Sequence, residues 1–273
     1  MVSGATTGGI VAPLFVPADR PERFSKAARS GADAIIIDLE DAVATSAKDG
    51  ARAVLGGRLP DEVPVLVRIN AVGTPWYEAD IAAMVACGAS GVVLPKAEDP
   101  GALADAARAI KGRCGLVALI ETARGLASAR AIAASGAVAR LAFGSFDYSA
   151  DLGCAHGRDA LLLARLEIVL ASRLAGLPAP LDGVTAATGD IAAVETDARY
   201  ARDLGFGGKL LIHPAQVAPA LDGFAPTEAE VVWARRVIDT ADGAAAVGGE
   251  MVDAPVRLRA QTILGRSREG GSR

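Results

Sequence analysis

The sequence predicts an α/β fold, a (β/α)8 or TIM barrel with a C-terminal helical extension. Three observations support this prediction. The chain has 273 residues, and a barrel of this kind needs about 250 residues as one domain. Eight short apolar runs rich in β-branched residues recur along it, and an alanine-rich helical segment follows each run. No GxGxxG motif opens a helix after the first run, which argues against a doubly wound open sheet.

The eight runs predict eight strands. In order, they are Val11–Val16, Ala34–Asp38, Val63–Ile69, Gly91–Leu94, Leu116–Ile120, Arg140–Phe143, Leu181–Val184 and Lys209–Ile212. The segments between them carry apolar residues at helical spacing. Ile81, Met84 and Val85 share one such face, and the longest segment is predicted to place on one face Leu161, Ala164, Ile168 and Leu174.

The domain organisation follows from this pattern. The barrel core is predicted to cover residues 1–224, and the helical extension is predicted to cover 225–273. The tail Gly265–Arg273 is charged and rich in glycine. We therefore expect the last residues to be disordered.

Composition and charge restrict the class of protein. Hydrophobic residues make up 51% of the chain, which is enough to build a large core. The net charge of -4 argues against a nucleic-acid-binding surface. No run of about 18 apolar residues and no export signal is visible, so we expect no membrane association. The three cysteines are isolated in the sequence, as is typical of a cytoplasmic protein.

Two carboxylates follow neighbouring predicted strands. Glu121 comes directly after the fifth strand, and Asp147 comes shortly after the sixth. Parallel barrel strands bring their carboxyl ends to one mouth, where catalytic groups lie. Either acid alone is explained more simply by helix capping or a salt bridge. Together they favour a hard, oxygen-liganded ion such as Mg²⁺ over zinc, because the chain has only two histidines and no paired cysteines.

Cationic side chains reach the same mouth. Arg68 ends the third strand, where its planar guanidinium is suited either to a substrate carboxylate or to an ion pair within the protein. Lys96 follows the fourth strand and is expected to pair with an acid such as Glu40 or Asp41. Both histidines stand alone in the sequence and are expected to be structural.

A basic cluster opens the first predicted helix. Arg20, Arg23 and Lys26 place positive charge where the helix dipole disfavours it, unless an anion such as phosphate offsets the charge. Asp19 and Glu22 are interleaved with the basic residues. The residues alone therefore favour a solvated face.

Eight longer motifs are distributed over nearly the whole chain. They are Leu14–Phe24, Ile37–Val43, Val67–Asn70, Leu94–Glu98, Ala118–Gly125, Gly144–Asp147, Ile212–Pro214 and Gly249–Pro255. These motifs resemble the citrate lyase beta-subunit-like family of the aldolase and citrate lyase superfamily. The resemblance implies a Mg²⁺-dependent barrel, commonly a homotrimer, that makes or breaks the carbon–carbon bond of a short 3-hydroxyacyl-CoA. Its partners would be a CoA thioester, such as citryl-CoA or malyl-CoA, and an oxo-acid.

The matching positions imply roles for individual residues. Glu121 and Asp147 match the two metal-binding acids, and Glu121 also borders the substrate. Arg68 matches the catalytic arginine that holds the oxo-acid and its developing charge. Arg20 and Lys26 match a first-loop motif associated with CoA phosphates, which reverses their interpretation as a solvated face.

Further positions carry implied roles. Glu40 and Asp41 match an acidic pair that orients metal-bound water. His213 lies in a matching segment and is a substrate-binding candidate. Asp253 matches the position from which related lyases deliver a catalytic proton donor or acceptor across a subunit interface. One position departs from the pattern, because many relatives have an acid where this chain has Phe146. The identity of the CoA ester therefore stays open.

Two other functions also stay open. A class II pyruvate-type aldolase of the same superfamily would use the metal without CoA. It would leave Arg20 and Lys26 without contacts and would need a histidine base near the metal, for which His213 is the only candidate. A non-catalytic CoA-binding relative would keep the fold without turnover, which the acids Glu121 and Asp147 argue against.

Overall fold

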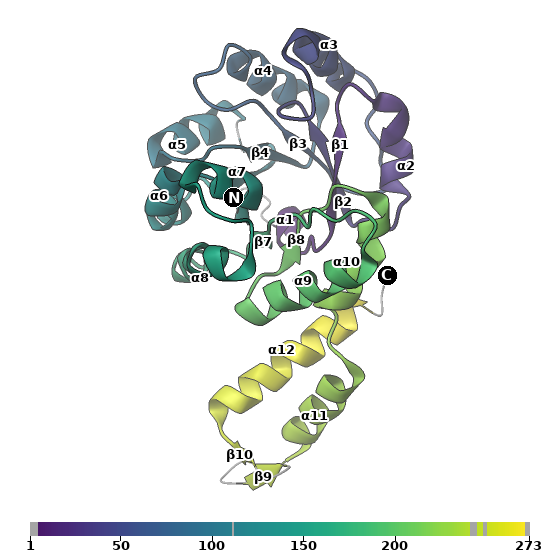
Figure 1. The fold of residues 1–273 in the computed structure, drawn as a ribbon, viewed down its shortest axis with the longest axis vertical. Helices are drawn as coiled ribbons and strands as arrows, with labels where there is room; N and C mark the ends of the chain where they lie inside the picture. The colour runs from purple at the N-terminus through teal and green to yellow at the C-terminus, as the bar shows by residue number, and fades with distance from the viewer. Residues whose placement is uncertain (1–4, 111, 241–244, 248–249, 271–273) are drawn as a thin grey trace. The chain divides into compact units, whose positions relative to one another are not determined.

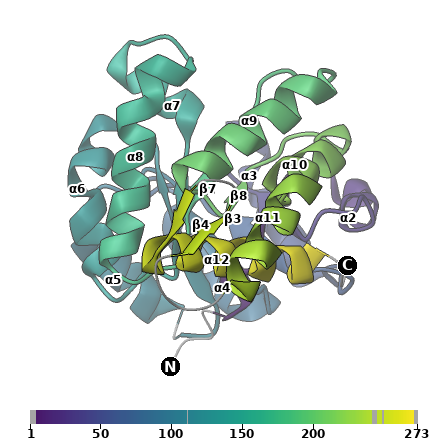
Figure 2. The ribbon, with the colours of Figure 1, turned by 90° about the horizontal axis from the view of Figure 1, so that it is seen from below.

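The computed structural model describes residues 5–110, 112–240, 245–247 and 250–270. The chain divides into two compact units, Met1–Leu221 and Asp222–Arg273. In the first unit the strands lie at the centre and the helices lie outside them, as two perpendicular views show (Figures 1 and 2). The second unit begins within a helix, α10 (Val217–Phe224), and is described separately below.

Eight parallel strands form the sheet of the first unit, in the order in which they occur along the chain. They are β1 (Pro13–Pro17), β2 (Ala34–Asp38), β3 (Val65–Arg68), β4 (Gly91–Leu94), β5 (Gly115–Ile120), β6 (Arg140–Phe143), β7 (Leu181–Asp182) and β8 (Gly208–Lys209). The sheet closes on itself, because Phe15 N donates to Leu211 O at 2.8 Å and Leu211 N donates to Pro13 O at 3.0 Å. The predicted (β/α)8 barrel is confirmed.

The last two strands are shorter than predicted. The runs predicted for them end at Val184 and Ile212, but β7 and β8 span two residues each. Beyond β8 the backbone still bonds to its neighbours, since Leu210 N donates to Asp182 O at 2.9 Å. The apolar run predicted as the eighth strand therefore includes residues after β8 that bond to neighbouring segments without forming regular strand.

The barrel interior is filled by alternate residues of the strands. In β2, Ala34 and Ile36 point into it, and every residue of this strand is buried. Strands of a parallel barrel are covered on both faces, which explains their continuous apolar runs. The interior cluster consists of Ile10, Ala34, Ile36, Leu66, Val93, Val117, Leu119, Ala142, Leu181 and Leu210.

Helices connect the strands on the outside of the barrel. The α-helices of the first unit, besides α10, are α1 (Ala5–Gly8), α2 (Phe24–Ala28), α3 (Lys48–Ala53), α4 (Tyr77–Cys87), α5 (Pro100–Ala109), α6 (Ala123–Ala134), α7 (Ser145–Leu152), α8 (Arg158–Leu174) and α9 (Ile191–Leu204). Short 3-10 helices are η1 (Pro21–Arg23), η2 (Thr45–Ala47), η3 (Val54–Gly56) and η4 (Pro214–Gln216). Side chains of Asp99, Thr122 and Asp190 cap the first turns of α5, α6 and α9.

One predicted helical face needs correction. In α8, Leu161, Ala164 and Ile168 are buried, as predicted, but Leu174 is 66% exposed. Six residues separate Leu174 from Ile168, which turns its side chain by about 240° around the helix. Leu174 therefore lies on a different face of α8.

The second unit is a helical hairpin with its own apolar cluster. Helices α11 (Glu228–Asp239) and α12 (Ala254–Gly270) pack against each other, and strands β9 (Ala245–Val247) and β10 (Glu250–Val252) pair antiparallel between them. The buried residues of this cluster are Ala234, Val237, Val252, Ala260 and Ile263. Helix α12 continues through most of the tail that we expected to be disordered, and residues 271–273 lie outside the described residues.

The extension is helical, as predicted. Among the residues that the structure describes, no helix is both long and apolar enough to span a bilayer.

The interior packing leads to a stability prediction. Ile36 is fully buried in the barrel interior. The substitution Ile36→Ala should lower the free energy of unfolding by about 3 kcal/mol, since it leaves a cavity. Ile191→Ala, at a side chain that is 60% exposed, should change it by less than about 0.5 kcal/mol. Urea denaturation followed by circular dichroism measures both, and equal losses would contradict the assigned packing.

Candidate active site

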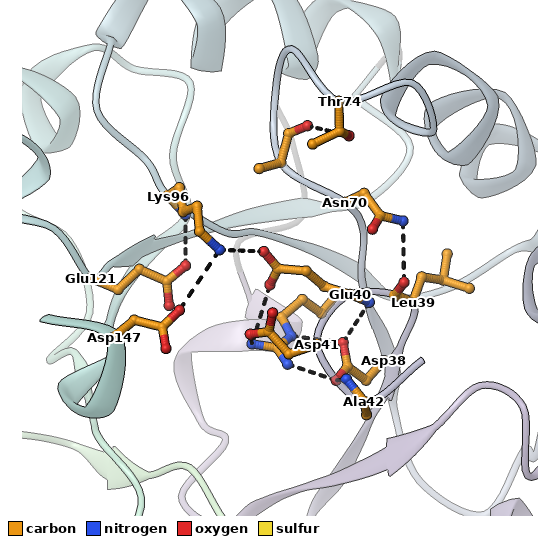
Figure 3. Close-up of polar contacts among 12 residues, drawn as sticks. Asp38, Leu39, Glu40, Asp41, Ala42, Asn70, Thr74, Lys96, Glu121 and Asp147 are labelled. Carbon is orange, nitrogen blue, oxygen red and sulfur yellow. Dashed lines mark hydrogen bonds and ion pairs between the residues drawn. The ribbon is translucent and has the colours of Figure 1, made fainter. Parts of the chain in front are cut away.

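Charged side chains gather at the carboxyl ends of five consecutive strands (Figure 3). Asp38 and Arg68 are the last residues of β2 and β3, and Lys96 follows β4. Glu121 comes directly after β5, and Asp147 lies in the first turn of α7 after β6. The barrel therefore places at one mouth residues that are far apart in the sequence, and this is the end where barrel enzymes carry their catalytic groups.

Arg68 is held by a bidentate ion pair with Asp38. Arg68 Nε lies 2.7 Å from Asp38 Oδ1, and Nη2 lies 2.6 Å from Asp38 Oδ2. The remaining nitrogen, Nη1, lies 3.3 Å from Glu40 Oε2 and 3.5 Å from Asp41 Oδ2. Burial lowers the pKa of Arg68, but the hydrogen bond and charge of Asp38 outweigh burial and raise it above its ordinary value. Arg68 is therefore a fixed positive charge.

Asp38 also shapes the loop that carries the two following acids. Its Oδ1 accepts a hydrogen bond from Glu40 N at 2.9 Å, and its Oδ2 accepts one from Ala42 N at 3.1 Å. One carboxylate thus orients both Arg68 and the backbone of Glu40 and Asp41. We predicted no such role for Asp38, although a charge ending an otherwise apolar strand was a visible signal.

Lys96 connects three carboxylates. Its Nζ lies 2.7 Å from Glu40 Oε1 and 3.7 Å from Asp147 Oδ2, and its backbone N–H donates to Glu121 Oε1 at 2.8 Å. The predicted pairing of Lys96 with Glu40 is present. Lys96 also has a φ of 46°, a left-handed conformation that is costly for a residue with a Cβ. This backbone geometry orients its N–H and its side chain toward different acids.

A buried lysine supports the acidic loop from behind. Lys48 Nζ donates to Leu39 O at 2.9 Å, to Glu40 O at 2.7 Å and to Asn70 Oδ1 at 2.7 Å. Asn70 in turn donates through Nδ2 to Asp80 Oδ2 at 2.6 Å. Sequence patterns did not indicate this network, because its members come from four separate segments.

The environment of Glu121 is electrostatically unfavourable for a free carboxylate. Its side chain is buried, and burial together with the nearby charge of Glu40 raises its pKa to about 8. Burial also raises the pKa of Glu40, although Arg68 and Lys96 lower it. A cation placed beside Glu121 would favour its ionised form.

The donor chemistry of this mouth fits a hard divalent cation. Five carboxylates, those of Asp38, Glu40, Asp41, Glu121 and Asp147, share it with two cations, Arg68 and Lys96. Oxygen donors of this kind suit Mg²⁺, which often takes only one or two carboxylates and completes its shell with water or substrate. In the described part of the chain no three His, Cys, Asp or Glu side chains surround one point. A site for such an ion would therefore rest on Glu121 and Asp147 with non-protein ligands.

A pocket of about 400 Å³ opens beside these acids. Asp41, Arg68, Glu121 and Asp147 line it, together with several apolar side chains. The structure thus brings together five of the predicted site residues, since Glu40 contacts Arg68 at its edge.

A second pocket of about 330 Å³ holds other predicted residues. Lys26 and His213 line it together with Arg23, and it shares Phe15 and Ile212 with the first pocket. Arg20 is not among its lining residues and lies 4.0 Å from Glu22 in an exposed ion pair. Of the basic cluster, Lys26 and Arg23 therefore lie where an anionic ligand would contact them.

The remaining predicted residues have clear local roles. His213 caps η4, because its Nδ1 accepts a hydrogen bond from Ala215 N at 3.2 Å, and it is not among the residues that line the first pocket. Asp253 belongs to the second unit, where its Oδ1 accepts a hydrogen bond from Val256 N at 3.1 Å. Its carboxylate is exposed at the start of α12.

Comparison with known proteins identifies the family. Residues 12–214 match the family model described as HpcH/HpaI aldolase/citrate lyase. The chain therefore belongs to the HpcH/HpaI aldolase/citrate lyase family. A citrate lyase subunit beta-like protein of Deinococcus radiodurans is 39% identical over 92% of this chain and 95% of its own length. The (3S)-malyl-CoA thioesterase of Cereibacter sphaeroides is 35% identical over 88% of each chain.

A solved structure of a similar protein contains bound ligands. Protein CitE from Mycobacterium tuberculosis, in complex with magnesium, acetoacetate and coenzyme A, superposes with a TM-score of 0.87. It is 36% identical and covers 95% of this chain and 98% of its own. The predicted family resemblance is confirmed. The chain therefore belongs to a family of carbon–carbon lyases.

The raised pKa of Glu121 predicts a pH dependence of stability. In the metal-free folded protein the pKa of about 8 lies above the ordinary 4.5, so the folded state binds a proton that the unfolded state releases. The free energy of unfolding of the wild type, measured relative to that of Glu121→Gln, should therefore be highest below about pH 4.5. It should fall as the pH rises through about 8. Urea titrations in EDTA should show a relative loss above about 1 kcal/mol between pH 5 and pH 9.

A control variant separates this effect from general titration. Glu22→Gln, which alters an exposed carboxylate, should follow the wild type at every pH. If the free energies of unfolding of the wild type and Glu121→Gln differ by the same amount at every pH, the assigned environment of Glu121 is wrong.

Proposed function

We propose that this protein is a Mg²⁺-dependent carbon–carbon lyase of a short 3-hydroxyacyl-CoA of the citryl-CoA or malyl-CoA type. The observation that carries the proposal is the shared pocket of Arg68, Glu121 and Asp147 at the barrel mouth. The pocket holds a fixed guanidinium, which suits the carboxylate of a hydroxy acid, and two carboxylates, which suit Mg²⁺. A relative of this family binds magnesium, a small oxo-acid and coenzyme A, which supports the same ligand classes here.

The proposed reaction balances as a retro-aldol cleavage. The 3-hydroxyl loses its proton, the bond between the hydroxyl-bearing carbon and the neighbouring CH₂ breaks, and its electron pair passes to the thioester as an enolate. Protonation of the enolate carbon gives the acyl-CoA, and the hydroxyl-bearing carbon becomes the carbonyl of an oxo-acid. The protein must therefore stabilise negative charge first on the oxygen and then on the enolate.

Glu121 and Asp147 would hold the metal. Bound there, Mg²⁺ would act as a Lewis acid that stabilises negative charge on the substrate oxygens. Glu40 and Asp41 would accept hydrogen bonds from water in this region and keep it oriented. Lys96 keeps Glu40 and Asp147 from repelling each other, since its Nζ lies 2.7 Å and 3.7 Å from their oxygens.

Arg68 would bind the carboxylate of the hydroxy acid. Asp38 occupies Nε and Nη2, so the guanidinium plane is fixed before substrate arrives. Nη1 faces Glu40 and Asp41 at the pocket edge and is the nitrogen best placed to shift toward a substrate oxygen. Such preorganised charge costs little reorganisation during the reaction.

The thioester half of the substrate would extend toward the second pocket. Lys26 lines that pocket beside Arg23 and His213, and we assign it to the phosphates of CoA. Arg20 lies outside the lining in an exposed ion pair, and we assign it to the same phosphates from the neighbouring 3-10 helix. His213 would contribute a further polar contact. The continuity of the two pockets through Phe15 and Ile212 supports a ligand that spans both.

Asp253 would protonate the enolate carbon from a neighbouring copy of the chain. Its exposed carboxylate at the start of α12 is available to another subunit. This role requires an oligomer, and we propose a homotrimer that works in the cytoplasm.

The alternatives have less support. A CoA-independent aldolase would need a histidine base beside the metal, but His213 belongs to the second pocket, and His156 stacks on Phe146 and does not line the first. A non-catalytic CoA-binding relative would not need a buried Glu121 with a raised pKa beside Arg68 and Lys96. The lyase therefore accounts for more of the site.

The decisive experiment follows carbon–carbon cleavage directly. The purified protein with Mg²⁺ is given malyl-, citramalyl- and citryl-CoA, and release of oxo-acid, acyl-CoA and free CoA is measured. Glu121→Ala should lower kcat/KM by at least about 100-fold, since charge stabilisation at a reacting oxygen contributes about this much. Because Glu121 is buried and accepts a hydrogen bond from Lys96 N–H, circular dichroism must show that the variant is folded under the assay conditions.

Controls distinguish the competing functions. Glu195→Ala, at a partly exposed acid on α9 outside both pockets, should keep full activity. Free CoA without oxo-acid would instead indicate a thioesterase. Activity that survives Glu121→Ala would remove the metal proposal, and binding of all three esters without any product would favour the non-catalytic relative.

A separate prediction concerns Asp253. Asp253→Asn should lower lyase turnover by about 100-fold or more, because a positioned proton donor contributes about that factor. Its KM and its sedimentation behaviour should stay close to those of the wild type. Hydrogen–deuterium exchange at the acyl-CoA methyl group, followed by NMR, should slow in parallel. Full turnover in Asp253→Asn with an intact oligomer would show that another group moves the proton.

A further inference from the structure

Large hydrophobic residues line much of the first pocket beside its charged residues. Seven of them form this apolar lining, namely Phe15, Leu119, Phe143, Phe146, Val184, Leu210 and Ile212. Phe146 directly precedes Asp147, and it is 40% exposed although it is a large aromatic residue. Its ring therefore borders the space next to a proposed metal ligand.

Phe146 is held in place by a histidine. The rings of Phe146 and His156 stack with centroids 4.1 Å apart and an angle of 6° between their planes. His156 Nε2 lies 2.9 Å from the hydroxyl of Ser145, which is buried. The stack fixes one face of the Phe146 ring from behind, and the exposed remainder of the ring lines the pocket.

The cations near this pocket are already engaged. Among the described residues that line it, Arg68 carries the single positive charge, and it faces the carboxylates of Asp38, Glu40 and Asp41. Lys96, just outside the lining, pairs with Glu40. A second substrate carboxylate placed against the ring of Phe146 would lose part of its hydration, and both of these cations already pair with acids of the protein. A hydrogen atom or a methyl group would lose nothing there.

We propose that Phe146, braced by His156, selects the substituent on the hydroxyl-bearing carbon of the substrate. The favoured substrates carry hydrogen or methyl at that carbon, as malyl-CoA and citramalyl-CoA do, and the disfavoured one carries carboxymethyl, as citryl-CoA does. The oxo-acid product is then glyoxylate or pyruvate and not oxaloacetate. This inference rests on the proposed lyase function and narrows its substrate.

The test compares two esters that differ only in this substituent. Wild-type kcat/KM should be at least about ten-fold higher for citramalyl-CoA than for citryl-CoA, a discrimination that a shaped apolar pocket can provide. Phe146→Lys supplies the missing cation and should lower this ratio by about ten-fold or more. Phe146→Leu keeps the wall apolar and should keep the ratio within about three-fold of the wild type.

Two further controls address charge and bracing. Leu163→Lys adds the same charge on α8 at a side chain that is 76% exposed and outside the pocket, so both rates should stay unchanged. His156→Phe preserves a stacked ring and should preserve the ratio, whereas His156→Ala releases the Phe146 ring and should lower the ratio.

A binding measurement makes the outcome independent of turnover. In calorimetry with Mg²⁺ present, the wild type should bind pyruvate at least about ten-fold more tightly than oxaloacetate, and Phe146→Lys should reverse or abolish this preference. An unchanged ratio in Phe146→Lys, with Mg²⁺ binding intact, would overturn the role of Phe146 while leaving the lyase function standing. If the wild type cleaves none of the esters, the proposed function fails and this inference fails with it.

Discussion

An excess of carboxylate at the barrel mouth is the constraint on which the rest of this site depends. Asp38, Glu40, Asp41, Glu121 and Asp147 meet there, and among the described residues the cations that pair with them are Arg68 and Lys96. Like charges at such distances raise each other's pKa or require a cation. Burial, with a smaller contribution from neighbouring acids, raises the pKa values of Glu40 and Glu121, and both cations contact more than one acid. A divalent ion would reduce the remaining imbalance.

The fold confines this concentration of charge to one layer of the barrel. The barrel interior below the mouth is apolar, and the strands that end there are buried on both faces. The charged side chains are therefore confined to strand ends and first helical turns, where the backbone can also serve them. Asp38 accepts hydrogen bonds from the loop that it precedes, and Glu121 accepts one from the left-handed Lys96. Stability and function thus occupy different layers of the same barrel.

Much of this arrangement could be predicted from the sequence, because the regular fold converts position along the chain into position in space. Glu121 and Asp147 follow neighbouring strands, so their meeting follows from the barrel alone. The pairing of Arg68 with Asp38 depends on register between β2 and β3, which periodicity does not determine. The support of Glu40 by Lys48 and the stacking of Phe146 on His156 depend on loop conformations. No local pattern encodes such contacts, since each joins segments whose relative placement only the folded chain defines.

The closeness of the two proposed metal ligands depends on a residue without a side chain. Gly144 lies between β6 and α7, and its N–H donates to Ile120 O at 2.9 Å, which aligns the ends of β5 and β6. A Cβ atom at Gly144 would overlap the carboxylate and Cβ of Glu121. Any other residue would push Glu121 away from the first turn of α7, where Asp147 lies. The glycine therefore sets the spacing of the two acids, and it does so through backbone contact alone.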